Sequence, residues 1–285
     1  MIPALFLTFF LKIYGMISAF FISFQKIEFT PILRYTYVGL HNWIELLSDP
    51  VFAKALQVTS YFSLLTIIIG IVLALGIALL LNENFRGRGM LRVLLLVPWA
   101  VPHVSNAQIW RWLFSIEYGI INGALIKFGL SESGIPWLID SRVAIHALVI
   151  AQTWKDVPFM ALLLLAALQT VPEQLHEAAK IDGASFWHRF RNVTLAHIRT
   201  TVFFVIIIEM IEMFKVFDIV YVATHGEPAN STMVLYLYIY RQVFEYVNFG
   251  YGAAVAYTLA AVVVVISLFY IKIFTGREQL WARAQ

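Results

Sequence analysis

Four ionisable side chains lie within an otherwise apolar run near residue 210. Glu209, Glu212, Lys215 and Asp218 follow one another at intervals of three residues, so on a helix they drift slowly around one side. Ionisable groups inside a membrane are costly and usually face the interior of a helix bundle or a water-filled path. The pattern indicates a candidate transport path, although a contact with a second subunit would explain Glu209 as well. Such acidic groups also suit a proton-coupled carrier, so the charges alone do not decide the class.

A second polar group interrupts the apolar run around residue 155. Trp154, Lys155 and Asp156 combine an aromatic face with two charges, a composition suited to sugar recognition. The alternative interpretation is that Lys155 and Asp156 form a structural pair. The candidate residues of the substrate path are Trp154, Lys155, Asp156, Glu212, Phe214 and Asp218.

A short polar segment, Glu177–Ser185, lies between two apolar runs and is therefore expected in water on one side of a membrane. Pro172 suits the first turn of a helix, and Gly183 is placed to end that helix in a left-handed conformation. Ser185 can cap a second helix. One face of the first helix would carry Leu175, Ala178, Ala179 and Asp182. Periodicity alone leaves two alternatives open, a docking element for another protein and an amphipathic hairpin lying on lipid headgroups.

These polar residues must be positioned by a bundle of membrane helices. The chain has 285 residues, of which 61% are hydrophobic and only 13% are charged, whereas soluble domains carry about 25% charged residues. The class is therefore an all-α polytopic membrane protein. The net charge of +3 is dispersed, so a nucleic-acid partner is not expected. The chain has no cysteine, no metal-binding histidine spacing and no phosphate-binding GxxxxGK[ST] loop, so we expect neither a metal site nor ATP hydrolysis by this chain.

About six transmembrane helices are expected, because each needs about 20 mainly apolar residues. The predicted spans are Ile2–Phe24, Val58–Leu81, Leu91–Phe114, Val143–Leu168, Thr201–Val222 and Ala253–Phe274. In the second span, Gly70 and Ala74 form a small-xxx-small pair suited to close helix packing. The first span has no leader typical of a removable signal peptide. We expect residues 1–30 to form a first transmembrane helix and residues 54–275 to form a transport core, with a cytoplasmic loop at about 171–199.

The distribution of Lys and Arg predicts the orientation in the membrane. The loops holding Arg86–Arg92, Lys180–Arg199 and Lys272–Arg283 are denser in basic residues than the opposite set. Because basic residues favour the cytoplasmic side, these loops and both termini are predicted to be cytoplasmic.

Several motifs resemble one family. The run Leu175–Ser185, with Phe190 and Thr194-Leu195 after it, resembles the EAA loop of permease subunits in binding-protein-dependent ABC importers. Segments that resemble the sugar branch of these permeases, in the right order, are Arg92–Pro102, Ile109–Phe114, Phe214–Tyr221 and Gly250–Ala254. Within that branch the chain is similar to the maltose or glycerol-phosphate type of first permease subunit. One departure is Leu195-Ala196-His197, where the family usually has Leu-Pro, and losing that proline would straighten the entry into the fifth span.

The resemblance implies a type I ABC importer permease in the cell membrane that forms the path for a sugar or related polyol. It implies a second permease subunit, two cytoplasmic ATPase subunits that use ATP and magnesium, and an extracellular solute-binding protein. This chain would bind no cofactor and would be no enzyme. The residues implied to couple to the ATPase are Glu177, Ala178, Ala179, Asp182, Gly183 and Ala184. The main alternative is a secondary, ion-coupled solute carrier, against which the lack of an evident internal repeat argues.

Overall fold

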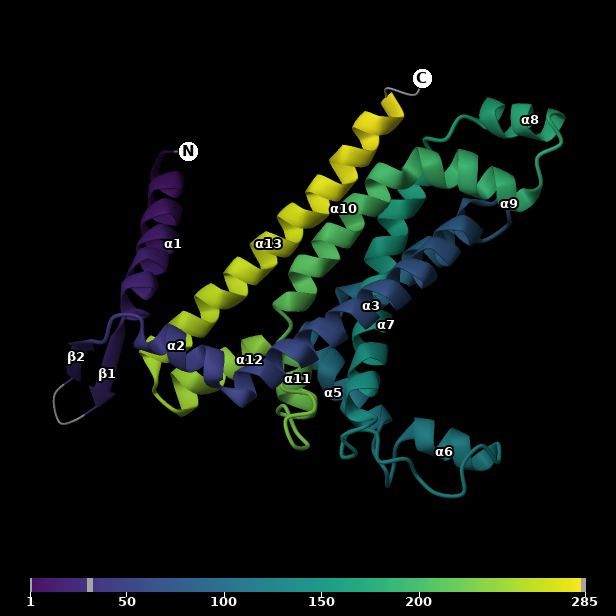
Figure 1. Ribbon diagram of the computed structural model, residues 1–285. Helices are drawn as coiled ribbons and strands as arrows, with labels where there is room; N and C mark the ends of the chain where they lie inside the picture. The colour runs from purple at the N-terminus through teal and green to yellow at the C-terminus, as the bar shows by residue number, and fades with distance from the viewer. Residues whose placement is uncertain (1, 30–32, 283–285) are drawn as a thin grey trace. The chain divides into compact units, whose positions relative to one another are not determined.

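The computed structural model describes residues 2–29 and 33–282 and is shown in Figure 1. The chain forms two compact units. The first, which we call the terminal unit, comprises the residues up to Ser60, then Phe214–Tyr221, then the residues from His225 onward. The second, which we call the central unit, comprises Tyr61–Met213 and Val222–Thr224. Met1, Thr30 and Arg283, on which parts of the predicted first domain and basic C-terminal loop fall, lie outside the described residues.

The terminal unit is built from helices and one small hairpin. Its elements are α1 (Ile2–Ile22), β1 (Gln25–Phe29), β2 (Leu33–Tyr37), α2 (His41–Ser48), the first part of α3 (Pro50–Asn82), most of α11 (Asp218–Ala223), α12 (Leu235–Tyr240), η2 (Arg241–Glu245) and α13 (Phe249–Ala282).

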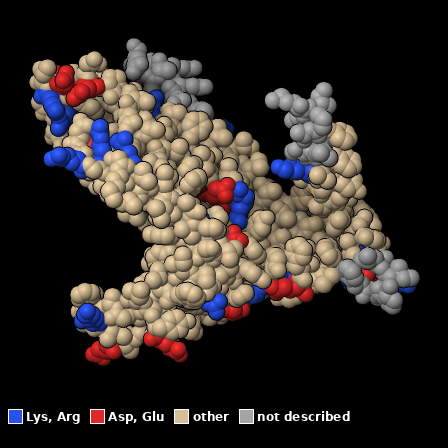
Figure 2. Space-filling model, turned by 180° about the vertical axis from the view of Figure 1, so that it is seen from behind, with Lys and Arg blue, Asp and Glu red and all other residues tan. Residues whose placement is uncertain are grey.

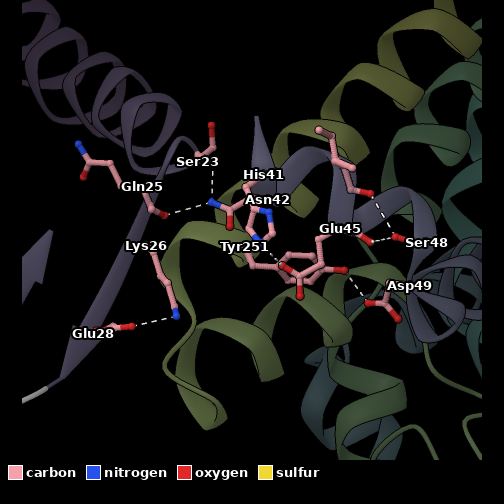
Figure 3. A network of polar contacts seen from close by, with 11 residues as sticks. Ser23, Gln25, Lys26, Glu28, His41, Asn42, Glu45, Ser48, Asp49 and Tyr251 are labelled. Carbon is pink, nitrogen blue, oxygen red and sulfur yellow. Dashed lines mark hydrogen bonds and ion pairs between the residues drawn. The ribbon is translucent and has the colours of Figure 1, made fainter. Parts of the chain in front are cut away.

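The hairpin was not predicted from the sequence. Strands β1 and β2 pair antiparallel, with Ile27 opposite Tyr35. The side chain of Asn42 in α2 holds the start of this hairpin against α2. Its Nδ2 atom donates to the carbonyls of Ser23 at 2.8 Å and Gln25 at 3.0 Å (Figure 3). Helix α13 also approaches β1 closely, since a Cβ atom at Gly250 would lie 1.8 Å from the Gln25 carbonyl oxygen. Only glycine leaves room for that contact.

The central unit is all helical. Its elements are the rest of α3, then α4 (Arg88–Ala100), α5 (His103–Leu113), α6 (Ile120–Lys127), α7 (Ala144–Leu168), α8 (Glu173–Ile181), α9 (Phe186–Arg189), η1 (Phe190–Thr194) and α10 (Leu195–Phe214).

The core of the central unit forms around α7, most of whose apolar window is buried. Leu164 of α7 is fully buried in one cluster with Ala74 of α3 and Ile198 of α10. The sulfur of Met160 lies 3.2 Å from where a Cβ atom at Gly70 would be. The prediction that Gly70 and Ala74 serve close helix packing is therefore confirmed, because larger side chains there would push α7 away from α3.

The expected helical membrane fold is confirmed. Among the described residues, four helices are long and apolar enough to cross a membrane. They are Pro50–Asn82, Ala144–Leu168, Phe186–Phe214 and Phe249–Lys272. The second and sixth spans are thus longer than predicted, while the described apolar part of the first helix is Phe9–Ile22.

Two predicted spans are not single helices. The third is divided, because α4 ends at Ala100 and α5 begins at His103. The residue before a proline avoids the helical conformation, and Val101 before Pro102 is extended, with ψ 129°. The fifth is also divided, because α10 ends at Phe214 and α11 begins only at Asp218.

Candidate functional site

Helix α8 ends in a hydrogen-bonded glycine cap. The Gly183 N–H donates to the Lys180 carbonyl at 3.0 Å, and the Ala184 N–H donates to the Ala179 carbonyl at 2.9 Å. These two bonds form a Schellman motif around Gly183, whose φ is +75°. The predicted left-handed end of the helix is confirmed. Pro172, by contrast, is not in the first turn but at the N-cap, where its extended backbone directs the chain into Glu173.

The outer surface of the same segment carries large apolar side chains. No described residue of α8 is buried. The exposed fraction is 87% for Ile181 at the end of α8 and 72% for Phe186 at the start of α9. Leu175 and Trp187 are exposed as well. In water, such a surface favours coverage by another apolar surface.

A helical path leads from this segment into α10. The Ser185 side chain accepts a hydrogen bond from the His188 N–H at 3.3 Å, so the predicted cap of the second helix is confirmed. The helix then continues through the π-helical turn η1 into α10, so that Phe186–Phe214 forms one long apolar helix. Helical structure therefore continues past Leu195, where the family usually has a proline, although the π-helical turn η1 directly precedes this residue.

A groove of about 570 Å³ separates α8 from the ends of α3 and α7. Glu177 lines it from α8, Arg189 from α9 and Glu83 from the residues after α3. Glu177 therefore lies on the side of α8 that faces its own unit. Charged side chains gather over this end of the central unit, at the upper left of Figure 2.

Within the central unit, α6 and α8 lie on opposite ends of α7 (Figure 1). Helix α6 precedes α7 in the chain and α8 follows it. A helix of 25 residues is about 37 Å long. That length crosses a membrane, so the loops before and after α7 face opposite aqueous phases.

Lys155, a predicted path residue, is buried in the central unit with 4% of its surface exposed. Its Nζ atom donates to the Trp99 carbonyl at 3.0 Å and to the Val101 carbonyl at 2.6 Å. Both carbonyls belong to the point where the third span is broken.

The neighbours of Lys155 have different partners. The Asp156 carboxylate accepts a hydrogen bond from Gln152 Nε2 at 2.7 Å, one turn earlier on α7. Trp154 remains 39% exposed, and its ring meets Trp110 of α5 edge-on, with centroids 5.9 Å apart. The three adjacent residues therefore point to three different environments.

Three carboxylates of the central unit lie close enough to interact electrostatically. The carboxyl group of Asp156 on α7 interacts electrostatically with that of Glu212 on α10. The carboxyl group of Glu209 interacts electrostatically with both. Glu209 is buried, with 5% of its surface exposed. The structure thus brings together Asp156 and Glu212, two of the predicted path residues.

The remaining two predicted path residues belong to the terminal unit. Phe214 is buried at the end of α10, and Asp218 begins α11. Beside them lies an aromatic cluster, in which Phe217 stacks on Tyr221 at 5.0 Å and contacts Tyr240 at 5.1 Å.

The sequence comparison now decides the family. The sequence pattern described as "Binding-protein-dependent transport system inner membrane component" matches residues 66–274, which is most of the chain. The chain belongs to this family of ABC importer permeases. It is a multi-pass protein of the inner membrane, and ATP hydrolysis in such importers resides in a partner subunit. A permease of this family needs no cofactor.

Curated relatives align with nearly the whole permease. It is 38% identical to the "Trehalose/maltose transport system permease protein MalF" of Thermococcus litoralis, over 91% of this chain and 86% of that one. It is 32% identical to the "Sulfoquinovosyl glycerol transport system permease protein SmoG" of Agrobacterium fabrum, over 97% and 89%. It is 34% identical to the "Lactose transport system permease protein LacF" of Rhizobium radiobacter, over 85% and 82%.

A solved structure shares the fold of the permease. A chain of a bacterial ABC transporter involved in the import of the acidic polysaccharide alginate superposes with a TM-score of 0.82. The match covers 96% of this chain and 93% of the other, at 22% identity.

Sequence reasoning missed a polar centre in the terminal unit of the permease. Asp49, just before α3, accepts a hydrogen bond from the hydroxyl group of Tyr251 at 2.5 Å (Figure 3). It also accepts from the hydroxyl group of Tyr238 and from the Val51 N–H at 2.8 Å. Burial raises the pKa of Asp49, but these hydrogen bonds outweigh it and hold the pKa below its ordinary value. The Asp49-Pro50 pair is a helix-start signal that could have found this residue.

Metal binding finds no support in the described part of the permease. There, no group of three or more His, Asp or Glu side chains is placed to hold a metal ion.

Proposed function

We propose that this permease forms the translocation path for a sugar or related polyol and couples to a cytoplasmic ATPase through α8 and α9. The observation that carries the coupling is the exposed apolar surface of α8 on a helix whose end is fixed by the Gly183 cap. The sugar class is supported by the relatives, whose names refer to trehalose, maltose, lactose and a sulfoquinovosyl glycerol. An ion-coupled carrier is set aside, because the chain belongs to an ATP-driven importer family.

The proposed assembly contains this permease, a second related permease, two cytoplasmic ATPase subunits and an extracellular solute-binding protein. Residues 54–275 would form the core, and residues 1–30 would add a first transmembrane helix. The 171–199 loop and both termini would be cytoplasmic, in keeping with the basic residues of that loop.

The mechanism requires rigid transmission of ATPase movement to the membrane helices. The small Ala178 and Ala179 would permit close approach of the ATPase, while Gly183 fixes the turn into α9. Asp182 and Ala184 flank that turn and extend the docking surface, while Glu177, which lines the groove behind α8, would contribute its charge to the coupling from that side. Because α9 continues into α10 without interruption, a displacement of the 171–199 loop would be passed directly to a membrane helix.

The substrate path is proposed to include Trp154, Asp156 and Glu212 of the central unit. Trp154 offers an exposed ring beside Trp110, and aromatic faces suit the apolar faces of sugars. The contacts of Lys155 with two backbone carbonyls support a structural role for that residue. Phe214 and Asp218, in the terminal unit, remain proposed path residues.

The coupling proposal is tested with Glu177→Lys and Gly183→Asp in the intact complex. We expect transport to be lost while the permease still reaches the membrane, because the first reverses a charge and the second adds a negative charge and a side chain at the turn where Gly183 has φ of +75°. Gly183→Asn should retain more transport, since asparagine can adopt this conformation as aspartate can but adds no charge. The matched control is Glu132→Lys, an exposed charge reversal in the loop between α6 and α7. Full transport by both variants, with the ATPase still co-purifying, would refute the proposal.

The substrate class is tested by screening sugars and polyols on the cognate binding protein by thermal shift. A ligand found in this way should then be transported by the complex with an increased KM in Trp154→Ala. Stabilisation by amino acids or inorganic ions alone would contradict the sugar assignment.

A further inference from the structure

The break in the third span leaves backbone groups that need partners. Pro98 lies inside α4, and Val101 is extended before Pro102, which has no N–H to donate. The regular ladder of the helix therefore stops at Ala100. In a membrane each unsatisfied carbonyl is costly, so a break of this kind needs donors from neighbouring elements.

Lys155 supplies these donors from α7. Its ammonium group spans the break, because one acceptor, the Trp99 carbonyl, is in α4 and the other, the Val101 carbonyl, is in the linking residue. A positive charge at the C-terminal end of a helix is also favoured by the partial negative charge of the helix dipole there. Asp156 interacts with this ammonium group electrostatically, but its carboxylate accepts a hydrogen bond from Gln152 on its own helix.

The contact is reinforced by packing beside it. The ring of Trp99 lies parallel to that of Phe159, with centroids 5.6 Å apart and an angle of 10° between the planes. Phe159 is one turn after Lys155 on α7. Two neighbouring residues of α7 therefore contact Trp99: Phe159 packs on its ring, and Lys155 donates to its carbonyl. Helix α7 is in turn buried in the core of the central unit.

We propose that Lys155 is a positioning residue that fixes the break between α4 and α5 and so makes the third span move together with α7 during transport. Without the two hydrogen bonds, α4 and α5 would reorient about Pro102. The third span would then no longer follow the movement of α7. This role depends only on membership of the importer family and not on the identity of the solute.

The test uses the absence of cysteine in the chain. Cysteines introduced at the exposed positions Val93 on α4 and Ile109 on α5 carry spin labels in the full complex in nanodiscs. We expect one narrow distance distribution in the parent protein and in Lys155→Arg, and a broadened or shifted one in Lys155→Met, which keeps the length of the side chain but removes its donors. Lys54→Met, at an exposed position of α3, is the matched control.

Transport measurements separate positioning from substrate contact. In Lys155→Met we expect the maximal rate to fall by at least about tenfold, the factor that corresponds to one unsatisfied buried acceptor, with KM changed less than about twofold. Lys155→Arg should recover most of the rate. If Lys155→Met fails to assemble, Lys155→Gln, which keeps one donor group, replaces it. A narrow, unchanged distance distribution, or a loss confined to KM, would overturn the proposal.

Discussion

Asp49 in the terminal unit and Lys155 in the central unit both stabilise the end of a membrane helix, but with opposite charges. Asp49 lies where α3 begins and accepts from N–H and O–H groups, whereas Lys155 lies where α4 ends and donates to carbonyls. Each sign is the one that the helix dipole favours at that end.

The two sites differ in the kind of partner they use. Asp49 relies on the side chains of Tyr238 and Tyr251, which come from α12 and α13, so it joins three segments of the terminal unit. Lys155 relies on backbone carbonyls alone, whose position is set by the break at Pro102. The partners of Asp49 can therefore be removed one at a time by mutation, while those of Lys155 can be changed only by moving the backbone.

Among substitutions near Asp49, Gly250→Ala is expected to lower the stability of the complex most. The new methyl group would lie 1.8 Å from the Gln25 carbonyl oxygen, so α13 and the neighbouring Tyr251 must shift away from β1. We expect a destabilisation of about 3 kcal/mol, at the upper end of the usual cost of overpacking, measured as a lowered thermal midpoint of the purified complex. Gly76→Ala is the control, because a methyl group there meets nothing within 4 Å. An unchanged midpoint in Gly250→Ala would show that the hairpin does not hold α13 in place.

A smaller effect is expected when single partners of Asp49 are removed. Tyr238→Phe and Tyr251→Phe should each cost about 1 kcal/mol, less than for a fully buried charged hydrogen bond because Asp49 is partly exposed. A double-mutant cycle of Tyr251→Phe with Asp49→Asn should give a coupling energy of at least about 0.5 kcal/mol, since the residues are in contact. If the free-energy changes of the two single substitutions simply added up in the double mutant, Asp49 would act only as the cap of α3.

The smallest expected effect is a dependence of the thermal stability on pH. The pKa of Asp49 is below its ordinary value of 3.8, so its stabilising contribution is present above that value and is lost as the pH falls through the folded pKa. The thermal midpoint of the parent complex should therefore decline more steeply between about pH 5 and pH 3 than that of Asp49→Asn. Parallel curves for the two proteins would contradict a charged Asp49 in the folded state.

Local signals in the sequence were sufficient to predict the helix caps of the 171–199 loop. Gly183 and Ser185 act through hydrogen bonds to residues within five positions of them, so their roles could be predicted without knowledge of the fold. The Asp49-Pro50 start of α3 is a signal of the same kind, although the tyrosine partners of Asp49 lie 189 and 202 residues further along the chain.

The breaks in the predicted spans were harder to foresee. Apolar composition continues through Val101, and around Val216 only Lys215 and Asp218 interrupt it, so length and hydropathy indicate one helix where the structure has two. The prolines at 98 and 102 raise the possibility of a break, but a break is tolerated only where another element satisfies the freed backbone groups. That element is Lys155, which lies more than fifty residues away.

The sequence by itself determined the helical membrane class, the family and the cap of α8, because each depends on composition or on residues close together in the chain. The tertiary structure decided that Lys155 serves the break of the third span, that Glu177 faces a groove in its own unit and that Asp49 joins three segments. These outcomes depend on which distant backbone and side-chain groups come within hydrogen-bonding distance, and this is set only when the helices pack.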